Sequence, residues 1–134
     1  MSLFQWNDSF SVGNAEIDDQ HKKLFQLADQ FHDAMAHGKG KQALQETLQE
    51  LIDYTKHHFA CEEKLMQKTA YPQYKEHKAE HDLLTSKVTK FRDDLAGDKV
   101  VVTIDVLEFL RGWLASHIGD MDRKVGEYMR RRAA

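Results

Sequence analysis

The sequence predicts an all-α protein folded as an up-down-up-down four-helix bundle with an extended N-terminal arm. Apolar residues recur at intervals of three and four along four segments, which is the pattern of amphipathic helices. The chain of 134 residues contains one proline and seven glycines, too few for the many turns of a β-sandwich. Its length suits a single domain, residues 1–134.

The arm is predicted over residues 1–18, which show no helical period. Large apolar side chains, Trp6 among them, should pack this segment across the bundle and keep it out of solvent. The first helix is expected over about 19–37, with Asp18 or Asp19 as its N-cap, because both side chains can accept hydrogen bonds from the first free N–H groups.

The remaining helices are predicted over about 41–68, 72–96 and 103–118, followed by a C-terminal segment, 119–134. Pro72 supports the start of the third helix, because proline suits the first helical turn and disfavours a helical residue before it. The connections between these segments are short, and short connections place consecutive helices antiparallel to one another.

Composition excludes several classes of function. The net charge of −3 is too small to favour nucleic acid, and the basic run at residues 130–132 fits a solvated helix end. No stretch of 18 apolar residues and no signal-peptide pattern is present in the sequence, so we expect a cytoplasmic protein without membrane insertion. Cys61 is the only cysteine, and a buried, inert thiol is the expected state.

Seven potential metal ligands lie on the predicted core stripes. His58 with Glu62 and His77 with His81 are each four residues apart, so each pair projects from one face of its helix. Burying these groups is costly unless they are satisfied together, and metal would satisfy them all. Seven ligands are too many for one ion, which predicts a two-metal site. The set is His21, His58, Glu62, His77, His81, His117 and Asp122.

Asp122 is the ligand that spacing supports least. Five residues separate it from His117, which on a regular α-helix turns the two side chains about 140° apart. Both can face one site only if the backbone departs from the α-helix between them, and Gly119 is well placed for that. Spacing alone leaves Asp120 as an equal candidate.

The donor set favours iron or manganese. The absence of a thiolate cluster argues against zinc-ribbon sites, and two shared carboxylates favour a bridged di-iron or di-manganese centre. We expect a site this rich in neutral imidazole to favour reversible dioxygen binding over oxidation of C–H bonds. A competing motif is His77-Lys78-Ala79-Glu80-His81, the His-x-x-Glu-His signature of one zinc peptidase class. That interpretation leaves the other ligands unexplained.

These motifs resemble those of the bacterial, single-domain members of the hemerythrin family. The resemblance covers essentially the whole chain, in order and at the expected separations. The matching residues are Trp6, Ile17-Asp18-Asp19-Gln20-His21, His58-Phe59-Ala60-Cys61-Glu62-Glu63, Tyr71-Pro72, His77 with His81, and Trp113-Leu114 with His117-Ile118 and Asp122.

The resemblance implies two non-heme iron ions joined by an oxo or hydroxo bridge. His77, His81 and His117 would bind one iron. His21 and His58 would bind the other, which would keep an open position for dioxygen.

The same resemblance assigns the bridging carboxylates and the oxygen pocket. Glu62 and Asp122 would bridge the two irons, which decides between Asp122 and Asp120 where spacing does not. The pocket residues it implies are Leu24, Phe59, Trp113 and Leu114. Dry apolar walls of this kind would slow the entry of protons and water.

The function expected from these observations is reversible dioxygen binding for storage, delivery or buffering of oxygen. The alternative is a module that senses oxygen, nitric oxide or redox state. An enzyme is not expected, because Leu24, Phe59 and Leu114 offer no proton donor. We further expect a monomer that serves an oxygen-consuming protein partner.

Overall fold

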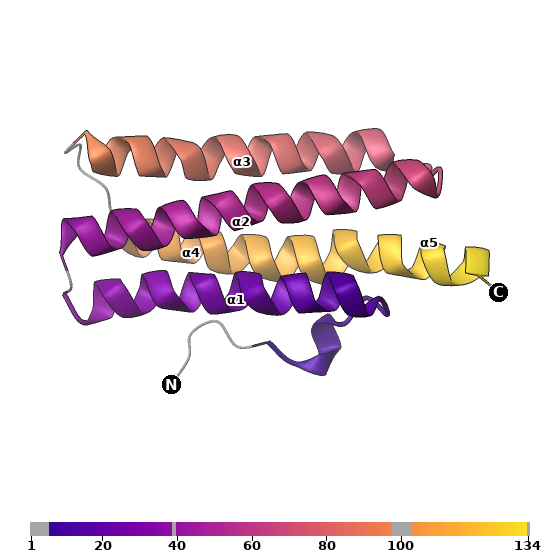
Figure 1. Cartoon of the computed structure of the whole chain (residues 1–134), viewed down its shortest axis with the longest axis horizontal. Coiled ribbons are helices and arrows are strands. Elements are labelled where there is room, and N and C mark those ends of the chain that lie inside the picture. Colours follow the sequence, from indigo (N-terminus) through magenta and orange to yellow (C-terminus); the bar gives the residue numbers. More distant parts are fainter. Residues whose placement is uncertain (1–5, 39, 98–102, 134) are drawn as a thin grey trace.

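Four long helical segments lie side by side and antiparallel in the computed structural model, which describes residues 6–38, 40–97 and 103–133 (Figure 1). The first three are single helices, and the fourth continues through a π-helical segment. Their bounds are α1 Ala15–Ala36, α2 Lys41–Lys68, α3 Tyr74–Ala96, α4 Thr103–Trp113, the π-helical segment Leu114–Asp122, and α5 Arg123–Ala133. The described residues contain no β-strand, and the predicted all-α, up-down-up-down bundle is confirmed.

The N-terminal segment is shorter than predicted and is not simply extended. Helix α1 begins at Ala15 because the Asn14 side chain accepts a hydrogen bond from the Ile17 N–H at 3.0 Å. Asp18 is therefore inside the helix and does not cap it. Its carboxylate instead accepts hydrogen bonds from the Val12 N–H and the Ser11 hydroxyl. Between residues 6 and 14 the chain forms a 3₁₀ turn, Asp8–Phe10, and residues 1–5 of the predicted arm lie outside the described part.

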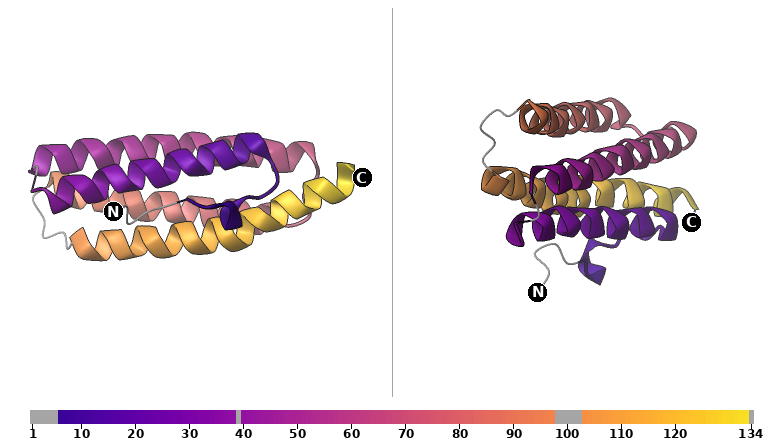
Figure 2. Two further views of the ribbon diagram at one scale, coloured as in Figure 1. Left: turned by 90° about the horizontal axis from the view of Figure 1, so that it is seen from below. Right: turned by 60° about the vertical axis from the view of Figure 1, so that its left-hand side comes forward.

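The N-terminal segment packs on the bundle, as its apolar side chains predict. Val12 is buried, and Trp6 and Phe10 pack against the main core. A Cβ atom added to Gly126 in α5 would lie 1.9 Å from the Val12 carbonyl oxygen, so only glycine allows this approach. Arg123 also donates to the Ser9 carbonyl. The segment therefore lies directly against the last helix, as Figure 2 shows from below.

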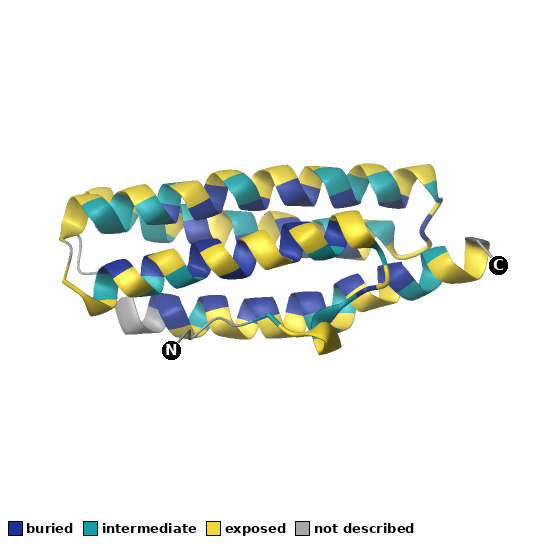
Figure 3. Ribbon diagram, turned by 60° about the horizontal axis from the view of Figure 1, so that its bottom comes forward, coloured by how far each residue is buried: buried dark blue, intermediate teal, exposed yellow. Residues whose placement is uncertain are grey.

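The apolar stripes of the helices meet in a single core along the bundle axis, while the outer faces are exposed (Figure 3). Each large side chain buried there contributes about 1.5–3 kcal/mol relative to exposure. A smaller cluster joins the ends of α2 and α5, where Tyr128 donates to the Thr69 carbonyl at 2.8 Å. No helix in the described ranges is long and apolar enough to cross a membrane.

The fourth helical segment continues past residue 118, where the sequence predicts its end. Gly119 neither stops nor caps it, and the chain stays helical to Ala133. The predicted C-terminal segment, 119–134, is therefore largely helical over its described residues. It provides one of the proposed metal ligands.

Candidate metal centre

All seven predicted ligand side chains converge in the core of the bundle. They come from every long helical segment, and none is more than 2% exposed. Helix α1 contributes His21, α2 contributes His58 and Glu62, α3 contributes His77 and His81, and the π-helical segment contributes His117 and Asp122.

The π-helical segment explains how His117 and Asp122 face the same site. A π-helix pairs backbone groups five residues apart, so side chains at that spacing share a face. His117 Nε2 consequently lies 3.2 Å from Asp122 Oδ1. The predicted departure from α-helical geometry is therefore the wider π-helical segment itself, which continues from α4 into α5 without a break. Asp120, the equal candidate by spacing, is exposed and outside the cluster.

Glu62 divides its two oxygens between two groups of histidines. Its Oε1 lies 3.1 Å from His58 Nε2 and 3.4 Å from His21 Nε2. Its Oε2 lies 3.2 Å from His81 Nε2 and 3.5 Å from His77 Nε2. The carboxylate thus spans the two groups, as a bridging ligand would.

Asp122 divides its oxygens in the same way. Its Oδ2 lies 2.8 Å from His21 Nε2 and 4.0 Å from His58 Nε2. Its Oδ1 lies 2.9 Å from His77 Nε2 and 3.2 Å from His117 Nε2. Each carboxylate therefore has one oxygen near His21 and His58 and the other near His77.

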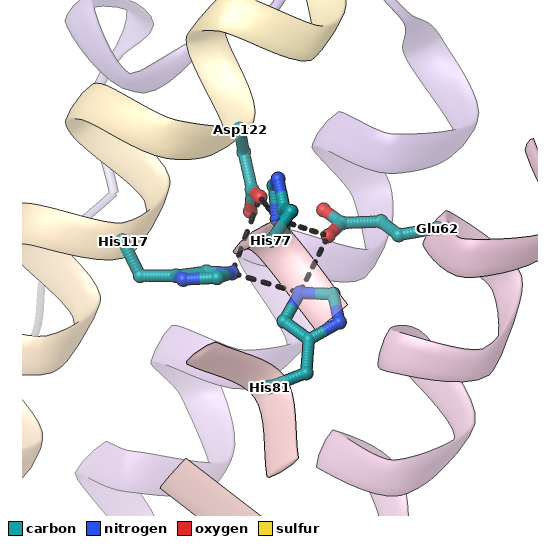
Figure 4. A group of neighbouring side chains, drawn as sticks. All are labelled: Glu62, His77, His81, His117 and Asp122. Carbon is teal, nitrogen blue, oxygen red and sulfur yellow. Dashed lines mark hydrogen bonds and ion pairs between the residues drawn. The ribbon is translucent and has the colours of Figure 1, made fainter. Parts of the chain in front are cut away.

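Two overlapping groups of potential ligands result, and both contain Glu62 and Asp122. The three-histidine half adds His77, His81 and His117 to these carboxylates (Figure 4). The two-histidine half adds His21 and His58. The ligand atoms within each half lie within 4.8 Å of one another, close enough for one ion to contact them all.

In the metal-free site, the buried carboxylates raise the pKa values of neighbouring histidines, and the histidines lower those of the carboxylates. Burial by itself would lower the pKa of His58, but the nearby carboxylates of Glu62 and Asp122 raise it to about 10. The same competition raises the pKa of His77 to about 9. Burial would raise the pKa of Asp122, yet His117 and the other imidazoles hold it well below its usual range. Without metal, the raised pKa values of His58 and His77 therefore favour their imidazolium forms beside the Glu62 and Asp122 carboxylates.

Hydrogen bonds within the described part of the chain leave several polar atoms of the cluster without a partner, whereas a metal ion would bind them. Several fully buried atoms have no hydrogen-bond partner among the described residues, although they lie close to other polar atoms. They are His21 Nδ1 and Nε2, His58 Nε2, His77 Nε2, His117 Nδ1, Glu62 Oε2, and both Asp122 carboxylate oxygens. Buried polar atoms of this kind need a partner. Imidazole nitrogens and carboxylate oxygens converging without thiolate suit an ion such as iron, manganese or zinc.

Two residues of the matching motifs, to which no role was assigned from the sequence, form hydrogen bonds with histidine ligands of other helices. Gln20 Oε1 lies 2.6 Å from His58 Nδ1, and Glu63 Oε2 lies 2.8 Å from His81 Nδ1. Both precede or follow a ligand directly in the sequence. That adjacency is the only sequence signal for them, because each contact joins two different helices.

The predicted oxygen-pocket residues are all buried in the main core. These residues are Leu24, Phe59, Trp113 and Leu114. The Phe59 ring stacks on the His81 imidazole, with 3.8 Å between the ring centroids and 4° between the ring planes. The Trp113 ring packs edge-on against the Phe59 ring, with 6.0 Å between their centroids. Apolar rings thus lie directly against the three-histidine half, and the role of these residues in binding oxygen stays a prediction.

The remaining candidates lie outside the site. Glu80 of the peptidase-like motif belongs to neither ligand group. His57 is exposed, and His32 is half-buried away from the cluster. Cys61 was expected to be buried, but it is partly exposed, with its Sγ 3.8 Å from His57 Nε2. It lies on the flank of α2 because its neighbour Glu62 occupies the inward face.

Comparison with known proteins identifies the family in which this arrangement occurs. Residues 12–128 match the family described as the hemerythrin HHE cation binding domain. The chain belongs to the hemerythrin family. It is 35% identical to a bacteriohemerythrin of Methylococcus capsulatus, over 94% of this chain and 96% of that protein. It is 37% identical to a bacteriohemerythrin of Pseudomonas aeruginosa, over 91% of this chain and 78% of that protein.

Solved hemerythrin structures share the fold. The crystal structure of a wild-type hemerythrin superimposes with a TM-score of 0.89 at 33% identity, covering 96% of this chain and 98% of that one. This hemerythrin-family chain therefore carries an iron-binding four-helix bundle.

Proposed function

We propose that this protein binds dioxygen reversibly at a pair of non-heme iron ions. The observation that carries the proposal is that each carboxylate directs one oxygen to the two-histidine half and the other to the three-histidine half. Glu62 and Asp122 both present one oxygen to each half of the site. Such sharing suits two ions held close together with an oxo or hydroxo bridge between them.

The two halves differ in a way that suits ligand binding. The three-histidine half offers five protein groups, and the two-histidine half offers four. His77, His81 and His117 would hold one iron, and His21 and His58 the other, with Glu62 and Asp122 shared. The half with fewer protein ligands would leave its metal ion free to take an additional small molecule. When bound, the iron pair supplies the electrons that a neutral dioxygen molecule needs in order to be held.

The chain's own residues would protect the bound gas. Leu24 and Leu114 are 1% exposed, and Phe59 is 3% exposed, so these side chains keep bulk water away from the cluster. None of the three offers a proton. A dry wall without proton donors slows the reactions that convert an oxygen carrier into an inactive form. Storage, delivery or buffering of oxygen is the role that we propose for such a site, and we expect a cytoplasmic monomer that serves an oxygen-consuming partner.

The test is a metal count combined with visible spectra in three states. The protein is reduced without air, then exposed to air, then deoxygenated again. Two irons per chain and an absorption band that appears in air and disappears on deoxygenation would support the proposal. Two irons that oxidise at once and stay oxidised would favour a sensor of oxygen, nitric oxide or redox state. One zinc and no visible band would overturn the di-iron assignment.

A further inference from the structure

In each half of the metal centre, one histidine has its Nδ1 atom within hydrogen-bond distance of a side-chain oxygen from another helix. His81 of the three-histidine half contacts Glu63, and His58 of the two-histidine half contacts Gln20. The two partners have nearly the same shape but differ in charge. One half is therefore supported by a carboxylate and the other by a neutral amide.

The atoms involved fix which nitrogen faces the metal. His81 Nε2 points to the cluster, 3.2 Å from Glu62 Oε2, while its Nδ1 lies 2.8 Å from Glu63 Oε2. An imidazole that donates its Nδ1–H to an oxygen keeps the Nε2 lone pair free for a metal. His58 is arranged the same way, with Gln20 as the acceptor. The Nδ1 atoms of His21 and His117 have no such partner among the described residues.

The charge of the acceptor changes the strength of the ligand. A hydrogen bond to a carboxylate is roughly twice as strong as one to a neutral group, and it draws the Nδ1 proton away from the ring. The ring then donates more electron density through Nε2, so the metal is bound more tightly. This effect applies to His81 and is weaker for His58.

We propose that Glu63 is a positioning residue that gives the three-histidine half the higher metal affinity, so this half loads first and empties last. The inference rests on the proposed two-metal centre and specifies the order in which its halves fill. In the two-histidine half, Gln20 accepts the corresponding hydrogen bond from His58, but its amide carries no charge. The chain thus builds an asymmetry outside the ligand set, in addition to the unequal number of histidines.

The position of Glu63 makes the proposal testable without disturbing the core. Its side chain is 19% exposed and lies along a groove between α2 and α3 that also includes Asp82. Lys78 lies 3.7 Å from Glu63 and 3.0 Å from Asp82. Truncation at Glu63 therefore opens towards solvent and creates no internal cavity. Asp82, 67% exposed and also paired with Lys78, is a matched control.

The experiment is a competition titration of the full-length, metal-free protein with Zn²⁺ against a coloured chelator. Zinc is the probe because it keeps one oxidation state. We expect the wild type to bind two ions with different affinities. In Glu63→Ala the tighter site should weaken by about 10- to 100-fold, the usual cost of losing such an outer partner, while the weaker site changes little. Asp82→Asn should match the wild type.

Two further variants separate charge from shape. Glu63→Gln keeps an acceptor oxygen like that of Gln20, so it should restore part of the lost affinity. Gln20→Glu should tighten the weaker site. In ¹⁵N-histidine NMR spectra of the zinc-loaded protein, the strongly hydrogen-bonded His81 Nδ1–H should be present in the wild type and absent in Glu63→Ala. Thermal unfolding of the metal-free variants checks that each one folds.

The outcomes distinguish this inference from the function proposed above. A wild type that binds fewer than two zinc ions would overturn the two-metal centre itself. Two bound ions with unchanged affinities in Glu63→Ala would overturn only the role of Glu63. Equal weakening of both sites in Glu63→Ala, or full wild-type affinity in Glu63→Gln, would also overturn it, because the charge on His81's partner would then have no selective effect.

Discussion

Asp122 Oδ1 lies 3.2 Å from His117 Nε2 although Asp122 is five positions further along one continuous helical segment. The corresponding pair in α2, His58 and Glu62, is four residues apart on a regular α-helix. The π-helical segment therefore changes which residue can serve as the second carboxylate. π-Helical turns inside α-helices are rare and occur often at functional sites.

Exchanging Asp122 for asparagine should disable the centre, and exchanging Asp120 should not. Asp122→Asn removes a charge shared by both halves, so iron affinity should fall by at least about 100-fold, more than loss of an outer partner usually costs. Asp120→Asn alters an exposed residue outside the cluster. The measurement is iron content per chain after reconstitution. Equal iron content in the two variants would contradict the assignment of Asp122.

Truncating Leu114 should shorten the time for which the protein keeps its capacity to bind oxygen. Leu114→Ala removes a fully buried side chain of the predicted oxygen pocket, which should ease the entry of water and protons and should also cost about 2–5 kcal/mol of stability through the cavity it leaves. The rate of loss of the oxygen-dependent absorption in air is the readout. Leu48→Ala is the control, because Leu48 is equally buried but several turns from His58 in α2. An identical rate for both variants would count against the pocket assignment.

Metal binding should release protons and should tighten as pH rises. In the metal-free protein the pKa of His58 is raised from 6.5 to about 10, and that of His77 is raised to about 9. Both imidazoles therefore hold protons near neutral pH, and a metal can bind Nε2 only after these leave. Zinc added to weakly buffered protein at about pH 7.5 should acidify the solution. No proton release would contradict the raised pKa values.

The same raised pKa values set the stability of the metal-free bundle. A raised pKa stabilises the fold below the unfolded value of 6.5, and this contribution is lost as pH rises through about 9 for His77 and about 10 for His58. Urea unfolding of the metal-free protein should therefore show lower stability at about pH 10 than at about pH 6.5. A free energy of unfolding that rises between these pH values would contradict the claim that ion pairs of His58 and His77 stabilise the metal-free fold.

Replacing Gly126 should displace the N-terminal segment. A Cβ atom there would lie 1.9 Å from the Val12 carbonyl oxygen, so Gly126→Ala should cost about 1–3 kcal/mol through overpacking. Gly112→Ala is the matched control, since nothing lies within 4 Å of its added Cβ. That exchange should gain about 0.5–1 kcal/mol, because glycine weakens a helix interior. Urea unfolding measures both, and an equal gain in stability would contradict the close approach.

The ligands could be found from the sequence because their spacing follows the core stripe. His58 with Glu62 and His77 with His81 have the four-residue interval of an α-helix. Those intervals by themselves predict pairs of side chains that face inward together. The bundle order followed in the same way from four apolar stripes and short connections.

Features that depend on contacts between helices could not be predicted. Gln20 and Glu63 act on histidines of other helices, 38 and 18 residues away. Asp18 or Asp19 was expected to cap α1, but Asn14, an equally good capping residue, caps it one turn earlier, while Asp18 accepts hydrogen bonds from the preceding segment. The π-helical segment has no propensity signal of its own, so only the resemblance to a family favoured Asp122 over Asp120.

The ligands of the centre come from the first long helical segment and from the last, so iron bound there, as proposed, would tie the abundance of this protein to iron supply. Ions held between His21 and Asp122 cross-link segments that are remote in the chain, and they bind the folded state only. A chain made during iron starvation would lack this cross-link and would keep only the ion pairs between its imidazoles and carboxylates. It therefore opens more often and is cut sooner by proteases, so cells short of iron would keep less of it.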